Sequence, residues 1–336
     1  MFSIVIPARL NSNLLKNTIN KILEQSYQNF EIIVILDLEN DQLIQNEKIK
    51  YLFSGIKSPG EKRNLGIKEA CGEYIAFLDD DAYPENDWLL QAKTIFETNP
   101  DYIGVCGPSV TPEESSFLEF VGGFIYESFL TSGPTRYRHI PSKHRLVDDY
   151  PTVNLIIKKN AIDSIGGFDT KYWPGEDTKF CLDLTLRFGK KIYYSPLLIV
   201  NHFRRTVFHA HLIQLSRYAT HRGFFAKKFP HTSFRISYFI PSSFLIYLLS
   251  LLGVFFLAPK YLGYFGIPLY LYILFFVVDA FKIYSKSGSS GATLLAIIGI
   301  FLSNITYGFF FLKGLISKPD LILREVDILN EKYIKG

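Results

Sequence analysis

Three consecutive aspartates, Asp79, Asp80 and Asp81, follow the apolar run 74–78, which has the composition of a buried strand. Like charges at a strand end repel one another and lose hydration unless a cation lies between them. Two carboxylates one residue apart in an extended segment can point to the same side. Oxygen ligands of this kind suit Mg²⁺ or Mn²⁺, which also grips phosphate oxygens. Asp79 and Asp81 therefore predict a divalent-metal site that bridges to a diphosphate.

Other polar side chains are expected near the same phosphates. Lys62, Arg63 and Asn64 lie in a basic turn before a short helical pattern and can meet a diphosphate. Asp37 directly follows the apolar run 30–36 and can accept hydrogen bonds from a ribose or a base. These groups predict that the ligand is a nucleotide diphosphate.

A second acidic pair, Glu176 and Asp177, opens a helical pattern at 176–189. Acids in a first helical turn are ordinary partners of the helix dipole, and this is one explanation for the pair. The other explanation is a general base, because a hydroxyl is a poor nucleophile until a nearby carboxylate takes its proton.

The elements around these residues alternate between strand and helix. Apolar strand patterns at 2–8, 30–38 and 73–79 are separated by helical patterns at 13–27 and 60–72, and a further helix is expected at 85–100. Such alternation predicts an α/β domain with a mainly parallel sheet. Ligands collect at the carboxyl ends of the strands in such sheets, so we expect one shared site there.

The bulk composition sets further limits. A net charge of +4 over 336 residues is mild and argues against a nucleic-acid partner held by charge. The cysteines, Cys71, Cys106 and Cys181, form no C-x-x-C pair and predict a reduced, cytosolic compartment. The first residues, MFSIVIPARL, are strand-like and do not resemble a secretory signal.

The last third of the chain has a different composition. Long apolar segments at 234–258, 261–281 and 292–312 carry one arginine, one aspartate and no charge respectively. Each is long enough to cross a hydrocarbon layer of about 30 Å, and aromatic residues crowd them as they do at membrane interfaces. The sequence predicts about three transmembrane helices.

The charges between these segments bear on orientation. Lys227 and Lys228 precede the first segment, and Lys282 and Lys286 separate the second from the third. If both groups are cytoplasmic, the N-terminal domain is inside. Three crossings would then place the tail outside, although it carries Lys318, Arg324, Lys332 and Lys335. An even number of crossings, with one segment lying in the interface, is the alternative.

Several blocks occur in an order that resembles glycosyltransferase family 2, whose members have the GT-A fold. They are FSIVIPARLN at 2–11, EIIVILD at 31–37, the stretch 60–84 that contains GEKRN and LDDDAYP, and the stretch 165–196 that contains IGGFD and WPGED. Together they cover roughly residues 2 to 205. The resemblance implies an enzyme that uses a nucleotide-activated sugar and a metal bound by D-x-D.

The resemblance also assigns roles to residues. It implies that Asp79 and Asp81 form the D-x-D pair and that His202 can supply a further metal ligand, although a lone histidine is equally often structural. It implies that Asp177 is the general base, with Glu176 orienting it. The residues expected at the donor are Pro7, Ala8, Arg9, Asp37, Lys62, Arg63, Asn64, Asp79 and Asp80.

The acidic pair separates two subclasses. Enzymes that glycosylate a polyprenyl phosphate attack with an ionised phosphate and need no strong base. Glu176 and Asp177 therefore favour a hydroxyl acceptor, such as a growing lipid-linked saccharide. A single in-line displacement inverts the anomeric centre, as the carboxylate geometry of inverting glycosidases suggests.

Two short motifs lie near or in the apolar region. One resembles the Q-x-x-R-W motif of membrane-bound polysaccharide synthases, with tyrosine in place of tryptophan, and consists of Gln214, Arg217 and Tyr218. An amphipathic helix that lies on anionic lipid explains the same residues equally well. The stretch 304–314, NITYGFFFLKG, resembles the last membrane segment of succinoglycan-type glycosyltransferases.

The sequence thus predicts an inverting, Mg²⁺- or Mn²⁺-dependent transferase that moves a sugar, with UDP-sugars favoured, to a lipid-linked saccharide at the cytoplasmic face of a prokaryotic plasma membrane. The alternatives are a polyprenyl-phosphate glycosyltransferase and a non-catalytic membrane scaffold. The expected boundaries are a GT-A domain at 1–230 (nucleotide-sugar half 1–110, acceptor half 111–205, interfacial helix 206–230), transmembrane helices at 231–315 and a tail at 316–336.

Overall fold

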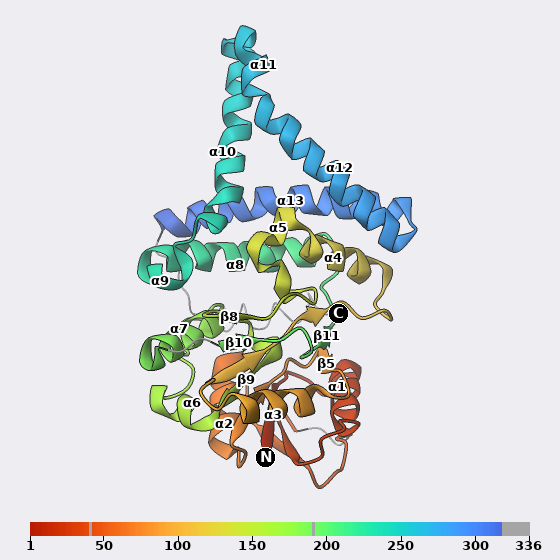
Figure 1. The fold of residues 1–336 in the computed structure, drawn as a ribbon, viewed down its shortest axis with the longest axis vertical. Helices are drawn as coiled ribbons and strands as arrows, with labels where there is room; N and C mark the ends of the chain where they lie inside the picture. Colours follow the sequence, from red (N-terminus) through yellow and green to blue (C-terminus); the bar gives the residue numbers. More distant parts are fainter. Residues whose placement is uncertain (40–41, 190–191, 318–336) are drawn as a thin grey trace. The chain divides into compact units, whose positions relative to one another are not determined.

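A computed structural model describes residues 1–39, 42–189 and 192–317, so nearly all of the expected tail lies outside the described residues. The described chain divides into two compact units. Among the described residues, the first contains Met1–Pro112 and Tyr137–Phe203, and the second contains Glu113–Arg136 and residues 204–317. Figure 1 shows the elements of both.

The first unit is built on an eight-stranded sheet. Four neighbouring strands run parallel, β9 is antiparallel to the strands on both its sides, and β8 is antiparallel to β10 at the edge. The strands in sheet order are β3 (Ile49–Phe53), β2 (Phe30–Leu36), β1 (Phe2–Pro7), β4 (Tyr74–Phe77), β9 (Leu155–Lys158), β6 (Gly104–Cys106), β10 (Ile192–Tyr194) and β8 (Arg145–Val147).

Helices cover both faces of this sheet, which explains why its central strands are apolar on both sides. Side chains of β1 alternate between two hydrophobic clusters: Ile4 and Ile6 face one, and Val5 faces the other. Helices α1 (Asn13–Leu23) and α3 (Trp88–Thr98) cover the first cluster. The second is covered by α2 (Pro59–Glu69), α6 (Lys159–Ile165) and α7 (Glu176–Phe188).

A second, three-stranded sheet stands at the carboxyl end of β4. It contains β5 (Ala82–Pro84), β11 (Val200–His202) and β7 (Ser109–Val110), in that order. The antiparallel register pairs His202 with Ala82, which places His202 next to the aspartates that follow β4. Two segments far apart in the sequence thus meet at one point.

The second unit is helical. Its helices are α4 (Phe117–Glu127), α5 (Phe129–Ser132), α8 (His209–Lys228), α9 (Pro230–Ser233), α10 (Ile236–Leu257), α11 (Leu262–Phe265), α12 (Ile267–Ser287) and α13 (Ser290–Ile316). Three of them, α10, α12 and α13, are long and apolar enough to cross a membrane. The expected architecture, an α/β domain with a mainly parallel sheet followed by apolar helices, is confirmed.

The compact units do not follow the expected boundary near residue 230. Helix α8 packs along α13, and α4 packs against the middle of the same helix, so both belong with the apolar helices. The reason is that α8 and α4 bury small and apolar side chains there, among them Ala219, Ile125 and Val121. The first unit therefore ends at Phe203.

One buried side chain ties the two sheets of the first unit together. The Asn154 amide nitrogen donates to the carbonyl oxygens of Gly107 (2.7 Å), Pro108 (3.1 Å) and Leu198 (2.6 Å), and its oxygen accepts from the Trp88 indole (2.9 Å). Leu198 leads into β11, so this network holds the strand that carries His202.

We expect Asn154→Ala to destabilise the first unit by about 3 kcal/mol, because it leaves the buried Trp88 indole N–H without this partner and removes the hydrogen bonds that join Gly107, Pro108 and Leu198. Denaturant unfolding of the purified protein measures this. Asn86→Ala is the matched control: it removes a single exposed hydrogen bond to Glu24 and should cost less than about 0.5 kcal/mol. Equal effects of the two changes would contradict the role given to Asn154.

Candidate active site

The donor side of the site lies at the carboxyl ends of β1 and β2. Ala8 continues the pairing of these strands through its amide, which donates to Ile35 O (2.9 Å). The Lys62 ammonium donates to the Ala8 carbonyl (2.6 Å) and forms an ion pair with the Asp37 carboxylate. Arg9 Nε lies 3.8 Å from the other oxygen of Asp37. These residues therefore form one connected group next to Pro7, the last residue of β1.

Lys62 is nearly fully buried in this arrangement. Burial lowers the pKa of its ammonium, and the paired Asp37 and the nearby Asp80 oppose that shift. The described structure thus uses Lys62 to fix the backbone at Ala8 and the carboxylate of Asp37. Its direct role at a phosphate stays a prediction.

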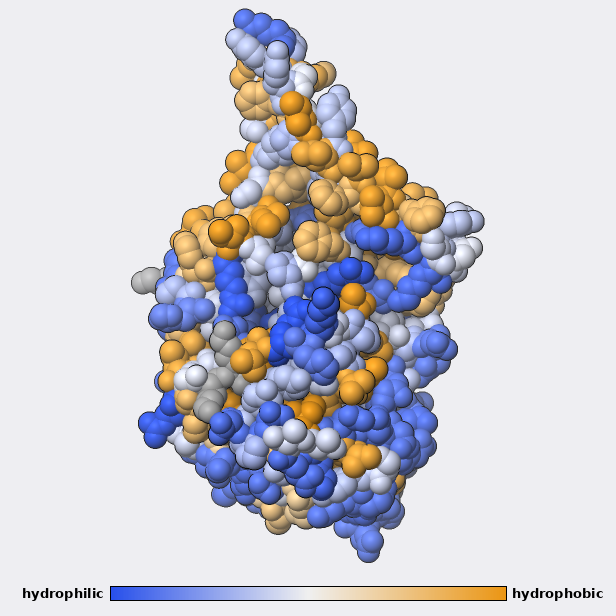
Figure 2. All heavy atoms as spheres, viewed as in Figure 1, coloured by the Kyte–Doolittle hydropathy of each residue, from blue (hydrophilic) through white to orange (hydrophobic). Residues whose placement is uncertain are grey.

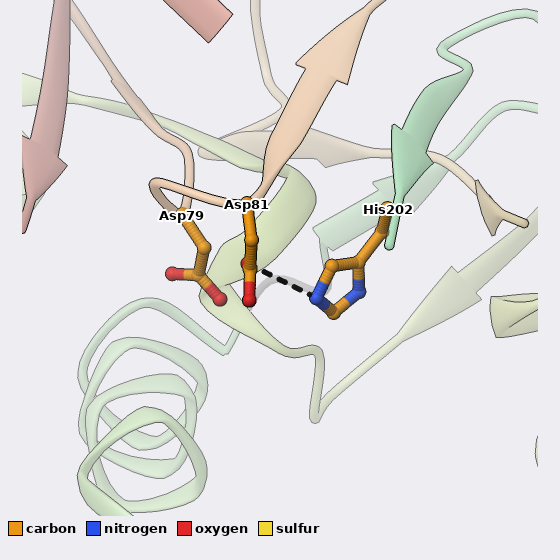
Figure 3. A group of neighbouring side chains, drawn as sticks. All are labelled: Asp79, Asp81 and His202. Carbon is orange, nitrogen blue, oxygen red and sulfur yellow. Dashed lines mark ion pairs between the residues drawn. The ribbon is translucent and has the colours of Figure 1, made fainter. Parts of the chain in front are cut away.

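The acidic segment after β4 meets the small sheet, as Figure 3 shows. His202 Nε2 lies 3.3 Å from Asp81 Oδ1, and ligand atoms of Asp79, Asp81 and His202 all lie within 4.8 Å of one another. The Phe203 amide also donates to Asp81 O (3.1 Å). Each of the three side chains retains partial exposure, between 21% and 31%.

The chemistry of this group fits a divalent cation. Two carboxylates and one imidazole offer oxygen and nitrogen atoms from two strand ends, and their partial exposure leaves room for further ligands. Asp80 is oriented differently: its backbone carbonyl lies 3.4 Å from the Thr18 hydroxyl, and its charge acts on Lys62. Among the described residues, Asp79, Asp81 and His202 are the group able to hold a metal.

Arg63 connects this group to the second acidic pair. One guanidinium nitrogen donates to Asp79 Oδ1 (2.9 Å) and the other donates to Glu176 Oε1 (3.0 Å). The side chain is almost fully buried, and its guanidinium lies over the Phe168 ring, 5.7 Å from the centroid. Burial alone would lower the pKa of Arg63, but the charges of Asp79 and Glu176 raise it. Arg63 thus remains charged and holds two carboxylates that come from distant segments.

Asn64 fixes the loop that leads to the acidic pair. Its amide nitrogen donates to Phe168 O (2.9 Å), and its oxygen accepts from Phe168 N (2.8 Å). The preceding Gly167 has φ +84°, and a Cβ there would lie 2.6 Å from the Asn64 oxygen, so glycine is required at this contact. The sequence analysis placed Asn64 near the phosphates, but its amide is committed to the backbone of this loop in the structure.

Glu176 and Asp177 form the first turn of α7. Glu176 is buried, and burial together with the charge of Asp177 raises the pKa of Glu176 to about 7, although Arg63 acts in the opposite direction. Asp177 is only partly buried, and its carboxylate accepts from Thr178 N (2.7 Å).

The sequence analysis missed two residues that support α7. Asp149 is buried and accepts from the Thr178 hydroxyl (3.1 Å), and Arg138 lies 3.4 Å from Asp149. Phe168 stacks on Phe180 of α7, with ring centroids 4.1 Å apart, and the Arg63 guanidinium lies over the same Phe168 ring. The stretch D-D-Y-P at 148–151 offered only a weak signal, because acids before a proline are common in turns.

Known proteins resemble this chain in sequence. Residues 3–166 match the family described as "Glycosyl transferase family 2", a range that includes β1, β4 and the D-x-D aspartates. Residues 3–166 are thus similar in sequence to this family of glycosyltransferases. The prediction that it is a glycosyltransferase is thereby confirmed.

Curated relatives of the chain are also glycosyltransferases. A dolichyl N-acetyl-alpha-D-glucosaminyl phosphate 3-beta-D-2,3-diacetamido-2,3-dideoxy-beta-D-glucuronosyltransferase of Methanococcus voltae is 26% identical and covers 94% of this chain and 97% of its own. A pre-mycofactocin glycosyltransferase of Mycobacterium tuberculosis is 27% identical over 61% of this chain and 43% of its own. A glucosyl-dolichyl phosphate glucuronosyltransferase of Haloferax volcanii is 22% identical over 55% and 63%.

A solved structure, S. aureus TarS, is 17% identical, covers 65% of this chain and 39% of its own, and has a TM-score of 0.40. Similarity at that level supports no functional argument. The family match and the curated relatives carry the assignment.

The raised pKa of Glu176 predicts a pH-dependent effect of Glu176→Gln. Because the pKa in the folded state, about 7, exceeds the ordinary value of 4.5, the wild type loses stability as pH rises through this window, and the glutamine variant does not. The melting temperature of the variant relative to wild type should therefore rise between about pH 4.5 and pH 7 and then level off.

Differential scanning fluorimetry across this pH range measures the effect. Glu69→Gln is a control of opposite sign, since the exposed Glu69 pairs with Lys50, which lowers the pKa of Glu69. A pH-independent difference for Glu176→Gln would contradict the assigned pKa.

Proposed function

We propose that this protein is an inverting, metal-dependent glycosyltransferase that moves a sugar from a nucleotide-sugar donor to a hydroxyl of a lipid-linked saccharide at a membrane. The observation that carries the proposal is the pair of acidic groups joined by Arg63. Asp79 and Glu176 each lie about one hydrogen bond from the same guanidinium, at 2.9 and 3.0 Å. A carboxylate proposed for the donor side, Asp79, and one of the pair proposed for the acceptor side, Glu176, are thereby held next to each other.

Asp177 is the proposed general base. The acceptor hydroxyl oxygen attacks the anomeric carbon, the bond from that carbon to the nucleotide diphosphate oxygen breaks, and the nucleotide diphosphate leaves with the electron pair. The hydroxyl proton passes to the Asp177 carboxylate. Displacement in one step inverts the anomeric configuration. Partial exposure of Asp177 keeps it reachable by an acceptor.

Glu176 and Arg63 act as positioning residues. Glu176 is buried against Arg63, and its charge lies close enough to Asp177 for the two to influence each other. Electrostatic repulsion from Glu176 makes Asp177 a better proton acceptor when both are ionised. Arg63 limits that repulsion and keeps Asp79 in place for the donor.

Asp79, Asp81 and His202 would hold Mg²⁺ or Mn²⁺. When bound, such an ion supplies Lewis-acid stabilisation to the leaving diphosphate. Ala8, Arg9 and Asp37 are the proposed contacts of the nucleotide, and the exposed part of Arg9 offers a charge that is free to meet phosphate. A UDP-sugar is the favoured donor on the family resemblance.

The acceptor assignment draws support from the relatives. The names of the Methanococcus voltae and Haloferax volcanii proteins describe acceptors that are sugars linked to dolichyl phosphate. Apolar helices α10, α12 and α13 suit an enzyme whose acceptor resides in a membrane. Basic residues at both ends of the apolar region favour a cytoplasmic catalytic unit, and the product would enter glycan or polysaccharide biosynthesis.

Asp177→Asn should lower the rate of sugar transfer by roughly 10²- to 10⁴-fold, because a carboxamide cannot accept the hydroxyl proton. The assay measures nucleotide release from a panel of sugar nucleotides with Mn²⁺ and lipid extract. Asp183→Asn is the matched control: it is an aspartate in the same helix that pairs with Lys179, and its loss should leave transfer nearly unchanged.

Lipid-stimulated release that survives Asp177→Asn would instead support the polyprenyl-phosphate alternative, in which an ionised phosphate attacks. No release with any donor, together with no binding of sugar nucleotides, would support a membrane scaffold.

The metal assignment has its own test. Asp81→Asn should weaken Mn²⁺ binding in the presence of uridine diphosphate at least about tenfold, because it removes a first ligand and the partner of His202. Electron paramagnetic resonance of free Mn²⁺ measures the affinity. Asp87→Asn, an exposed aspartate a few residues further on, serves as the control. Unchanged Mn²⁺ affinity in Asp81→Asn would contradict the proposed site.

A further inference from the structure

The apolar helices of the second unit differ in how much of each is buried. The most apolar windows of α10 and α12 are 6% and 11% buried, whereas that of α13 is 39% buried. Figure 1 shows α13 lying along α8, while α10 and α12 leave this pair and meet at α11. Length and composition suggest three similar spans, but α13 lies in a more buried environment than α10 and α12.

Contacts with α13 run along most of α8 and involve the second half of α13. The His211 ring lies 2.9 Å from the Ser303 hydroxyl, Thr220 O would lie 1.9 Å from a Cβ at Gly314, and Lys227 Nζ donates to Ser317 O (2.9 Å). The contact positions advance together along the two helices, so these helices lie parallel and side by side. Any tilt of α13 relative to a membrane is shared by α8.

Helix α8 is too polar to accompany α13 across a membrane. Arg217 and Arg222 stand in its middle, and a charged side chain is costly at the centre of a bilayer. Its ionisable residues are His209, His211, Arg217, His221, Arg222, Lys227 and Lys228. A transmembrane α13 would draw this whole set into hydrocarbon.

The two faces of α13 differ in the way that a helix in the membrane interface requires. Its buried residues are mostly small or polar, which allows close packing, and Ile300 and Phe311 are the large apolar ones among them. The small and polar ones are Ala292, Ala296, Gly299, Ser303, Asn304, Gly308 and Gly314. The opposite face exposes large apolar side chains: Leu294, Ile298, Phe301, Phe309 and Ile316. An apolar stripe on one side and a polar support on the other are typical of helices that lie in the interface plane.

Polar contacts also mark where the hairpin of α10 and α12 begins. Asp279 of α12 accepts a hydrogen bond from the buried Ser128 hydroxyl, and Lys286 pairs with Glu127 (2.8 Å). Ser242 of α10 donates to Gly308 O of α13 (2.9 Å). Further along, both helices expose large apolar side chains, as the orange upper part of Figure 2 shows.

We propose that α10 and α12 form the membrane-crossing hairpin and that α13 lies in the membrane interface with α8 on its aqueous side. The surface that contacts lipid is the stripe of Leu294, Ile298, Phe301 and Phe309, continuous with the exposed sides of the hairpin, and it ends before Ile316 at the terminus of α13. Basic residues of α8 suit anionic lipid headgroups on the same side.

This arrangement removes the conflict in the charge distribution. With two crossings, the residues that follow α13 stay on the side of α8. Lys318, Arg324, Lys332 and Lys335, whose structure lies outside the described residues, then share that side with Lys227 and Lys228. Most of the basic residues that flank the apolar helices then lie on one side, as the positive-inside tendency requires, and the tip of the hairpin carries a single lysine, Lys260.

The first test is the side from which cysteines react with a membrane-impermeant maleimide. The exposed native Cys71 reports the side of the catalytic unit. In a Cys71→Ser background, Ile316→Cys reports the end of α13 and Lys260→Cys reports the tip of the hairpin. Sealed cells and inverted vesicles that contain the full chain supply the two orientations.

We expect Ile316→Cys to be labelled from the same side as Cys71, and Lys260→Cys to be labelled from the opposite side. Labelling of Ile316→Cys from the side opposite to Cys71 would overturn the interfacial position of α13. Labelling of Lys260→Cys from the Cys71 side would overturn the crossing hairpin. Sugar transfer by each variant shows that the protein remains folded.

The second test measures depth with nitroxide labels in phosphatidylcholine–phosphatidylglycerol bilayers. Phe301 stands near the middle of α13 and Ile246 near the middle of α10. A label at Phe301→Cys should lie at the headgroup–acyl boundary and be more accessible to a water-soluble relaxation agent than a label at Ile246→Cys, which should be deep. Equal depth at the two positions would show that α13 crosses the membrane.

Discussion

The buried guanidinium of Arg63 is the interaction on which the site depends. It comes from the middle of α2 and is held between Asp79, which follows β4, and Glu176, which opens α7. Removing one partner of a buried ion pair costs about 3 to 5 kcal/mol, because the remaining charge loses its compensation. The three segments are therefore coupled more strongly than the length of chain between them suggests.

Several weaker contacts set the geometry of this ion pair. Ser58 and Glu61 form a capping box that fixes the start of α2, and Asn64 on the same helix holds the backbone of Phe168. Phe168 in turn places an aromatic face against Arg63. Helix α2 thus positions Lys62, Arg63 and Asn64 as supports for the ends of β1 and β2, for Asp79 and for the loop at Phe168 respectively.

The second unit packs a charged helix, α8, against the apolar helix α13. Small residues on α13 allow α8 to approach closely, and the polar groups of α12 are satisfied at its base by Ser128 and Glu127. An unsatisfied polar group in hydrocarbon costs several kcal/mol. The side chains of α12 that pair with Ser128 and Glu127 therefore mark the end of the helix that lies outside the hydrocarbon. Helix orientation within this unit therefore follows from where the polar side chains find partners.

The sequence alone determined the elements that depend on local pattern. Apolar periodicity predicts β1, β2, β4 and the helices between them, and the D-D-D and E-D pairs mark the two acidic groups, because strand ends and helix starts are encoded within a few residues. It also predicts three long apolar segments, since length and hydropathy are local properties as well.

Only the tertiary structure decided which of these groups meet. The pairing of β11 with β5 brings His202 to Asp81 across more than a hundred residues, and no local pattern encodes that register. Arg63 and Asn64 suit phosphate contacts by residue type, yet burial commits them to Asp79, Glu176 and the backbone of Phe168. Likewise, hydropathy cannot distinguish α13 from α10, because the difference lies in the charged helix that packs beside it.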